Sequence, residues 1–382
     1  MKFRILTFLL LAIILKESDA QPIARVEVVK IQSKALNQER DILVYTPADY
    51  DYRTNESFDV IYVFDSQNRE MFDYTSSIVS FLSNSTKSYI VVGITSPYNA
   101  TLDYSRNNDL LPVLVTEKSK QNFSGKYYGN ADNFLNYVAL EVVPYVNSNY
   151  RTLNHSIAVG HSLGASFVLY SMLKKTNLFA SYIAISPNLA YDDEVLGNQI
   201  INFDYTKVKN PTYIFISNAS EGINSWKEWK PAREKVYSFF RNSLKNPNIM
   251  VKISEFPNSS HWGTFPQSLT SALEYYFQNI QKVHDNELSV SEYEVKIRVK
   301  VPKSDDTIYI AGNQIGLGSW DPGRVKMKRL SDYERELSLK LRSPAQFKFT
   351  RGSWDAEAEV VGAYGNITIK PESKNIFTFE VK

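Results

Sequence analysis

Short apolar runs alternate with amphipathic stretches from Arg25 to His284. Runs rich in β-branched and aromatic residues occur at 60–64, 89–94, 156–159, 182–185, 213–216 and 250–253. Because these runs are apolar at nearly every position, they are typical of strands buried on both faces of a parallel sheet. Between them, apolar residues recur at helical spacing over 131–146, 165–174, 231–244 and 268–283. This alternation predicts an α/β fold with a mostly parallel central sheet.

The pattern changes after His284. Polar and apolar residues alternate over 292–301, which is typical of a strand with one face in water. Similar short strands are expected at 307–310, 336–341, 346–350, 366–369 and 376–381. We therefore predict an α/β domain over 21–284 and a small all-β sandwich over 290–382, separated by a polar stretch at 282–288.

The first twenty residues have the features of an export signal. Lys2 and Arg4 precede an apolar run at 5–14, and Ser18 and Ala20 are small residues where a signal peptidase cleaves. The apolar run is too short to span a bilayer comfortably. We expect residues 1–20 to be a signal peptide of an exported bacterial protein, periplasmic or secreted, with no stable membrane insertion.

Composition excludes several classes of function. The formal net charge is +2, and no basic patch is interleaved with aromatic residues, so nucleic acid is not an expected partner. The chain has no cysteine, which rules out a thiol nucleophile and a cysteine-ligated zinc site. Its four histidines are scattered without metal-ligand spacing. We expect neither a metal nor a cofactor.

The segment Gly160-His161-Ser162-Leu163-Gly164 matches the pattern G-x-S-x-G. It follows the apolar run 157–159 and precedes the helical pattern that begins at Ala165, as a nucleophile elbow requires. This context predicts that Ser162 is a nucleophile at the carboxyl end of a strand. The backbone N–H of Leu163 would then donate to an oxyanion.

A serine nucleophile needs a general base, and elimination leaves His261. His161 lies within the elbow, His155 lies at the far end of the nucleophile strand, and His284 lies in the expected linker. His261 follows a predicted strand in a loop, and the order serine, acid, histidine is that of α/β-hydrolases.

The acid of the triad should follow a strand between Ser162 and His261. Glu221, five residues after the strand 213–216, is the preferred candidate. Asp192 and Asp193 are the alternatives. A second oxyanion donor is expected after the strand 60–64, from the backbone N–H of Ser66 or Gln67.

These residues resemble the family of putative esterases that includes esterase D and the enterochelin esterases. The resemblance covers most of 36–280, and its further carriers are 39–47, 61–65, 150–151 and 185–187. It implies an α/β-hydrolase fold, a triad of Ser162, His261 and Glu221, and an oxyanion hole at Leu163 and Ser66 or Gln67. Ser66 and Ala165 stand where family members often have glycine. The family's substrates include siderophore esters, carbohydrate esters and small thioesters, and some members transfer acyl groups.

The C-terminal part resembles a starch-binding or related carbohydrate-binding sandwich. The carriers are 310–312, 317–322, 347–350 and 352–354. The resemblance implies a sugar platform formed by Trp320, Lys348 and Trp354, since indole faces stack on sugar rings and an amine donates to hydroxyls. The alternative is that both tryptophans pack in the core or against the other domain.

Together these observations predict an exported serine esterase that forms an acyl-enzyme. A carbohydrate-linked ester is the preferred substrate, because a sugar-binding-like domain is attached. A catecholate siderophore ester is the close alternative. Acyl transfer on the same triad and a non-catalytic glycan-binding protein are the other hypotheses.

Overall fold

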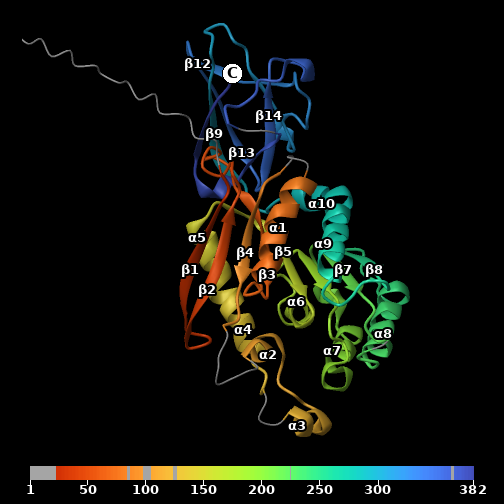
Figure 1. Cartoon of the computed structure of the whole chain (residues 1–382). Coiled ribbons are helices and arrows are strands. Elements are labelled where there is room, and N and C mark those ends of the chain that lie inside the picture. The colour runs from red at the N-terminus through yellow and green to blue at the C-terminus, as the bar shows by residue number, and fades with distance from the viewer. Residues whose placement is uncertain (1–22, 84–86, 98–104, 124–126, 224, 363–364) are drawn as a thin grey trace, which may run out of the picture.

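The computed structural model describes residues 23–83, 87–97, 105–123, 127–223, 225–362 and 365–382. The expected signal peptide, residues 1–20, lies outside them. Figure 1 shows an α/β domain with a smaller β domain stacked on one end of it. Among the described helices, none has the length and apolar character needed to cross a membrane.

In the described part of the chain, eight strands form the central sheet in the order β1-β2-β4-β3-β5-β6-β7-β8. Their bounds are β1 Arg25–Ser33, β2 Gln38–Thr46, β3 Phe58–Phe64, β4 Tyr89–Ile94, β5 Thr152–His161, β6 Ser181–Ile185, β7 Thr212–Asn218 and β8 Ile249–Glu255. The β1–β2 and β2–β4 pairs are antiparallel, and the remaining neighbours are parallel. The predicted mostly parallel sheet is confirmed.

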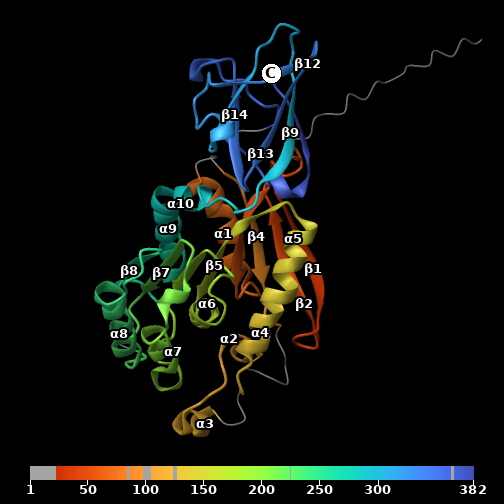
Figure 2. The same cartoon turned by 180° about the vertical axis from the view of Figure 1, so that it is seen from behind.

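Helices cover both faces of this sheet (Figures 1 and 2). One face packs against α1 (Arg69–Leu82) and α9 (Thr264–Tyr275), which continues through η3 (Tyr276–Ile280) into α10 (Gln281–Asp285). The other face packs against α4 (Ala131–Tyr137), η1 (Val138–Val142), α5 (Val143–Asn149), α6 (Leu163–Lys174), α7 (Tyr191–Ile201) and α8 (Trp229–Asn242). The shorter helices are α2 (Ser105–Leu110), α3 (Glu117–Phe123) and η2 (Tyr205–Lys207). Burial of both faces explains why the parallel strands are continuously apolar.

The C-terminal domain is a β-sandwich. Within the described residues it has two four-stranded sheets, β11-β10-β14-β15 and β12-β13-β9-β16. The strands are β9 Tyr293–Lys300, β10 Tyr309–Gly312, β11 Val325–Lys326, β12 Lys328–Ser331, β13 Glu334–Leu341, β14 Ala345–Thr350, β15 Ile367–Ile369 and β16 Ile376–Glu380. Short 3-10 turns η4 (Ile315–Leu317), η5 (Trp354–Ala356) and η6 (Pro371–Ser373) connect them. Inward-facing residues of both sheets share one core, as alternating strands predict.

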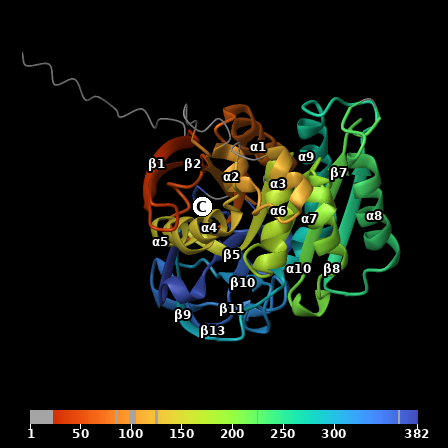
Figure 3. The ribbon, with the colours of Figure 1, turned by 90° about the horizontal axis from the view of Figure 1, so that it is seen from below.

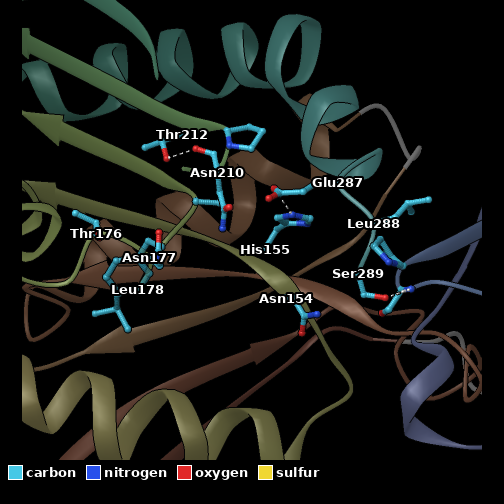
Figure 4. A pocket seen from close by; sticks show the side chains of 15 residues that line it. Asn154, His155, Thr176, Asn177, Leu178, Asn210, Thr212, Glu287, Leu288 and Ser289 are labelled. Carbon is cyan, nitrogen blue, oxygen red and sulfur yellow. Dashed lines mark hydrogen bonds and ion pairs between the residues drawn. The ribbon is translucent and has the colours of Figure 1, made fainter. Parts of the chain in front are cut away.

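The two domains meet at the end of the sheet where the parallel strands begin. The N–H of Ser57, just before β3, donates to the carbonyl of Thr368 at 3.0 Å, and Glu56 Oε2 accepts the N–H of Thr368 at 3.1 Å. A cavity of about 210 Å³ lies at the same junction. Figure 4 shows His155 and Glu287 beside it, joined at 3.2 Å. Ser162 lies at the opposite end of β5. The sandwich therefore lies at the amino ends of the parallel strands, and the elbow lies at their carboxyl ends.

Candidate active site

The elbow forms where β5 ends at His161 and α6 begins at Leu163. Ser162 lies between them with φ 57° and ψ −119°, a strained conformation that a side chain adopts where the surrounding structure enforces it. Its N–H donates to the carbonyl of Ile185, the last residue of β6, at 2.9 Å. The strand, sharp turn and helix expected around Ser162 are therefore present.

His261 and Glu221 come together from loops that follow adjacent strands. His261 Nδ1 lies 2.6 Å from Glu221 Oε1, and the other carboxylate oxygen accepts the N–H of Ala219 at 2.7 Å. Arg233 donates to the main-chain carbonyl of Glu221 at 2.6 Å, which fixes the loop. Burial raises the pKa of Glu221, but hydrogen bonds from His261 and the backbone outweigh it and hold the pKa below its ordinary value. The carboxylate is therefore ionised and orients the imidazole.

With Nδ1 committed to Glu221, His261 Nε2 is the ring nitrogen left to take a proton from Ser162. In the described residues, Ser162 Oγ and the His261 ring are not hydrogen-bonded to each other. Such contacts are often long before substrate binds and close in the reactive complex. The bond between His261 and Glu221 is thus present in the structure, whereas we expect the contact between Ser162 and His261 to form when substrate binds.

His161, which its position in the elbow excluded as the general base, contacts the loop that carries His261. Its Nε2 lies 2.8 Å from the carbonyl oxygen of His261, and the two rings lie 4.6 Å apart between centroids. Burial and the neighbouring His261 ring lower the pKa of His161 to about 4, so its imidazole is neutral and donates from Nε2. The residue before the nucleophile therefore holds the loop of the base over the elbow. The position of His161 beside Ser162 was the only sequence signal for this contact, because its partner His261 lies 100 residues away.

The candidate oxyanion hole requires one correction. The N–H of Ser66 donates to the carbonyl of Ile94 at 3.1 Å, so Ser66 is not available as a donor. Among the described residues, the N–H of Gln67 has no protein acceptor, and its side chain is fixed by bonds to Asp65 at 2.8 Å and to the N–H of Ser96 at 2.9 Å. Leu163 is the first residue of α6, where N–H groups point out of the helix. Gln67 and Leu163 are therefore the two candidate donors.

A partly buried ion pair lies directly beside the elbow. Arg106 binds both carboxylate oxygens of Asp65, at 2.7 and 2.5 Å, and Asp65 is buried. A Cβ on Gly164 would lie 3.2 Å from Asp65 Oδ2, which places this carboxylate against the first turn of α6. Arg106 was missed, because nothing in its local pattern indicates a partner 41 residues away.

The alternative acids have other partners. Asp192 accepts hydrogen bonds from the N–H groups of Val115 and Thr116, at 2.7 and 3.1 Å. Asp193 forms an exposed ion pair with Lys118 at 2.8 Å. Neither carboxylate contacts His261, so Glu221 is the acid that the structure favours.

Tryptophan side chains surround the His261 ring. Trp226 and Trp229 stack on each other with centroids 5.0 Å apart, and their rings lie 5.0 and 5.6 Å from that of His261. Trp262 lies 6.1 Å away on the same loop as His261. Trp226 and Trp262 are 46% and 62% exposed, so they present wide aromatic surface beside the base.

In the described residues, Trp320, Lys348 and Trp354, which were expected to form a sugar platform, share no hydrogen bond, ion pair or ring contact with one another. The Lys348 amine pairs with Glu357 at 2.8 Å, and a cavity of about 270 Å³ lies at this pair. Trp354 is exposed, whereas Trp320 is half-buried and donates its main-chain N–H to Gly312. Within the described residues, the two indole rings make no ring contact with each other. The described residues also contain no group of three or more His, Cys, Asp or Glu able to hold a metal ion.

Comparison with known proteins identifies the family of the chain. A family model described as "Putative esterase" matches residues 33–307. Ferri-bacillibactin esterase BesA of Bacillus subtilis (strain 168) is 22% identical over 191 residues, which are 49% of this chain and 66% of that protein, slightly under two thirds of its length.

Solved structures share the fold at low identity. An IroE-like serine hydrolase from Shewanella oneidensis is 20% identical with a TM-score of 0.56, covering 66% of this chain and 80% of that one. The siderophore hydrolase EstA from Aspergillus nidulans is 17% identical with a TM-score of 0.53, covering 66% and 94%. Each of these two structures covers about two thirds of this chain.

Proposed function

Since the chain belongs to the putative-esterase family of serine esterases, we propose that it hydrolyses carboxylic esters through a triad of Ser162, His261 and Glu221. The observation that carries this proposal is the 2.6 Å bond between His261 Nδ1 and Glu221 at the edge of the sheet where the elbow presents Ser162. No other described carboxylate is bonded to this ring.

The mechanism follows from these positions. His261 Nε2 takes the proton of Ser162 Oγ as the oxygen attacks the ester carbonyl, and Glu221 stabilises the imidazolium. The N–H groups of Leu163 and Gln67 bind the oxyanion. The imidazolium then protonates the departing alcohol. Water, deprotonated by His261, attacks the acyl-enzyme and releases the acid.

The tryptophans favour an ester with a planar aromatic acyl group. Trp226 and Trp262 are exposed, and their ring centroids lie 5.0 and 6.1 Å from that of the general base, His261. An aromatic acid would stack on them as its carbonyl approaches Ser162. We propose a carbohydrate as the alcohol, because the C-terminal sandwich resembles a glycan-binding domain. A catecholate siderophore is the second candidate, and the named activity of the Bacillus subtilis relative favours it.

An activity screen separates these candidates. We expect the protein to release the acid from p-nitrophenyl, feruloylated and catecholate esters faster than acetate from acetylated sugars. Preference between feruloylated oligosaccharides and a ferric catecholate identifies the alcohol part, and new esters formed with added sugar acceptors would identify acyl transfer. Ser162→Ala should abolish each activity and labelling by a fluorophosphonate. Full activity in this variant would rule out the proposed mechanism.

Export is a separate proposal. The charged start, apolar run and small residues of 1–20 support removal of this segment on export by a bacterium. Expression of the full chain in a bacterial host, followed by N-terminal sequencing of the periplasmic or secreted product, tests it. We expect the mature chain to begin at Gln21.

A further inference from the structure

A segment that precedes α4 crosses the edge of the sheet where Ser162 lies. We call residues 111–123, which include α3, the cap segment. Leu111 and Leu114 form a buried cluster with Tyr191, and Leu163 packs against it. Figures 1 and 3 show α3 beyond the ends of α6 and α7, on the side away from the sandwich. The cap segment thus contacts the residue that follows the nucleophile.

One carboxylate anchors the middle of the cap segment. Asp192 Oδ2 accepts the N–H of Val115 at 2.7 Å, and Oδ1 accepts the N–H and the hydroxyl of Thr116 at 3.1 and 2.6 Å. Asp192 is 3% exposed. The neighbouring Tyr191 hydroxyl donates to the carbonyl of Pro112 at 2.8 Å. The start of α7 therefore holds the cap segment through charge-assisted bonds that water competes for poorly.

The backbone that presents this carboxylate is strained. Asp192, Asp193 and Glu194 have φ values of 53°, 54° and 68°, the left-handed region that non-glycine residues rarely occupy in succession. Strain of this kind persists where the surrounding structure enforces a conformation, and it concentrates at functional sites. Of these residues, Asp192 is the one whose carboxylate binds the backbone of the cap segment, whereas Asp193 forms an exposed ion pair with the Lys118 side chain.

The cap segment also adds apolar surface near the elbow. Val113 and Val115 are exposed, although they flank the buried Leu114. Large apolar side chains held in the open on an anchored segment are suited to contact a bound molecule. A small ester would react at Ser162 without reaching them, whereas a bulky ester extends toward the cap segment.

We propose that Asp192 is a positioning residue that fixes the cap segment against Leu163 and thereby sets the affinity for bulky esters. This inference rests on the proposed esterase function. It assigns the strained start of α7 to substrate selection rather than to the triad.

The test compares Asp192→Asn with Asp193→Asn in the full chain. Asparagine keeps the size of the side chain, but its amide N–H groups cannot accept all the bonds that the carboxylate accepts. For Asp192→Asn we expect KM for a feruloylated oligosaccharide or other bulky aromatic ester to rise about tenfold, and kcat for that ester and for p-nitrophenyl acetate to stay within about twofold. The control Asp193→Asn, next in the chain and equally strained, should keep both constants, because it removes only an exposed ion pair with Lys118.

Limited proteolysis provides a second readout, with faster cleavage of the cap segment expected in Asp192→Asn. If Asp192→Asn fails to fold, Thr116→Val replaces it as the test variant. It removes one donor to Asp192 and should give a smaller rise in KM for the bulky ester. An equal fall in kcat/KM for both esters, or an unchanged KM in both Asp192→Asn and Thr116→Val, would overturn the proposal. The esterase function fails separately, if Ser162→Ala retains hydrolysis.

Discussion

At the scale of single residues, the imidazole of His261 is fixed by contacts from several elements. Glu221 from the loop after β7 holds Nδ1, His161 from the end of β5 holds the main-chain carbonyl, and Trp226 packs edge-on against the ring. A base fixed in this way loses little conformational freedom on reaching the transition state. Its tautomer is also set, since an ionised Glu221 requires a proton on Nδ1.

Glu221→Gln should therefore lower kcat for ester hydrolysis by about 10³–10⁴-fold, because an amide stabilises neither the correct tautomer nor the imidazolium. Steady-state kinetics on a p-nitrophenyl ester measures this. Glu228→Gln, an exposed carboxylate on the same loop region, is the matched control and should retain wild-type kcat. A loss smaller than tenfold in Glu221→Gln would show that another group orients the base.

The candidate site residues that the sequence predicted and those that it did not differ in how local their sequence signals are. Ser162 was predictable because strand, turn and helix are consecutive, and Glu221 because it follows a buried strand. His161 and Arg106 work through partners 100 and 41 residues away, which periodicity does not reveal. Of the two alternatives Ser66 and Gln67 for the second oxyanion donor, Gln67 is favoured, because the N–H of Ser66 is bonded to Ile94 at the end of β4.

At the scale of elements, the elbow depends on close contact between β5 and α6. A Cβ at Gly160 would lie 2.3 Å from the main chain of Gly164, whereas a Cβ at Gly164 would meet Asp65 Oδ2 at 3.2 Å. The first position excludes any side chain unless strand and helix separate. The second requires a small adjustment of one side chain.

We expect Gly160→Ala to lower the free energy of unfolding by about 3 kcal/mol or more, because backbone atoms must move. Gly164→Ala should stay within about 1 kcal/mol of wild type, since alanine favours the helix and offsets the tight contact. Urea denaturation of both variants measures the difference. Equal stabilities would contradict the packing of α6 on β5.

Element boundaries were less predictable than element types. The amphipathic pattern over 131–146 predicted one helix, and the structure has α4, the π-turn η1 and α5, with Pro144 in the first turn of α5. The hairpin β1–β2 was not among the expected strands. β1 is an edge strand with exposed Val26 and Val28, so it lacks the continuous apolar run of the inner strands.

At the scale of the whole molecule, two buried histidines make stability depend on pH. Burial is the main cause that lowers the pKa of His161 and of His284 to about 4. Between the ordinary value and this one, the unfolded chain binds more protons than the folded chain. The free energy of unfolding is therefore full above about pH 6.5 and falls as pH drops toward 4, by up to about 3 kcal/mol for each histidine.

Urea denaturation at about pH 7 and pH 5 tests this dependence. His284→Gln, far from Ser162, should lose about 2 kcal/mol less than wild type between these pH values, because one titrating group is gone. Equal losses in the two proteins would show that His284 is protonated in the folded state or accessible to water.

Because the sandwich lies far from Ser162, we expect its junction with the α/β domain to affect stability but not catalysis. Glu56 is buried at the junction, where it pairs with Arg53 at 2.6 Å and accepts the N–H of Thr368 from β15. Glu56→Ala leaves both donors without this carboxylate, so we expect the free energy of unfolding to fall by about 3 kcal/mol. Lys340→Ala, which removes a long exposed pair on the sandwich, should cost less than about 1 kcal/mol.

Because Ser162 lies at the opposite edge of the sheet, kcat/KM for a p-nitrophenyl ester should stay within about twofold in both variants. A large loss of kcat/KM in Glu56→Ala, measured under conditions where the protein remains folded, would mean that the junction is coupled to the elbow through the strands. The sandwich would then influence the reaction without touching the substrate.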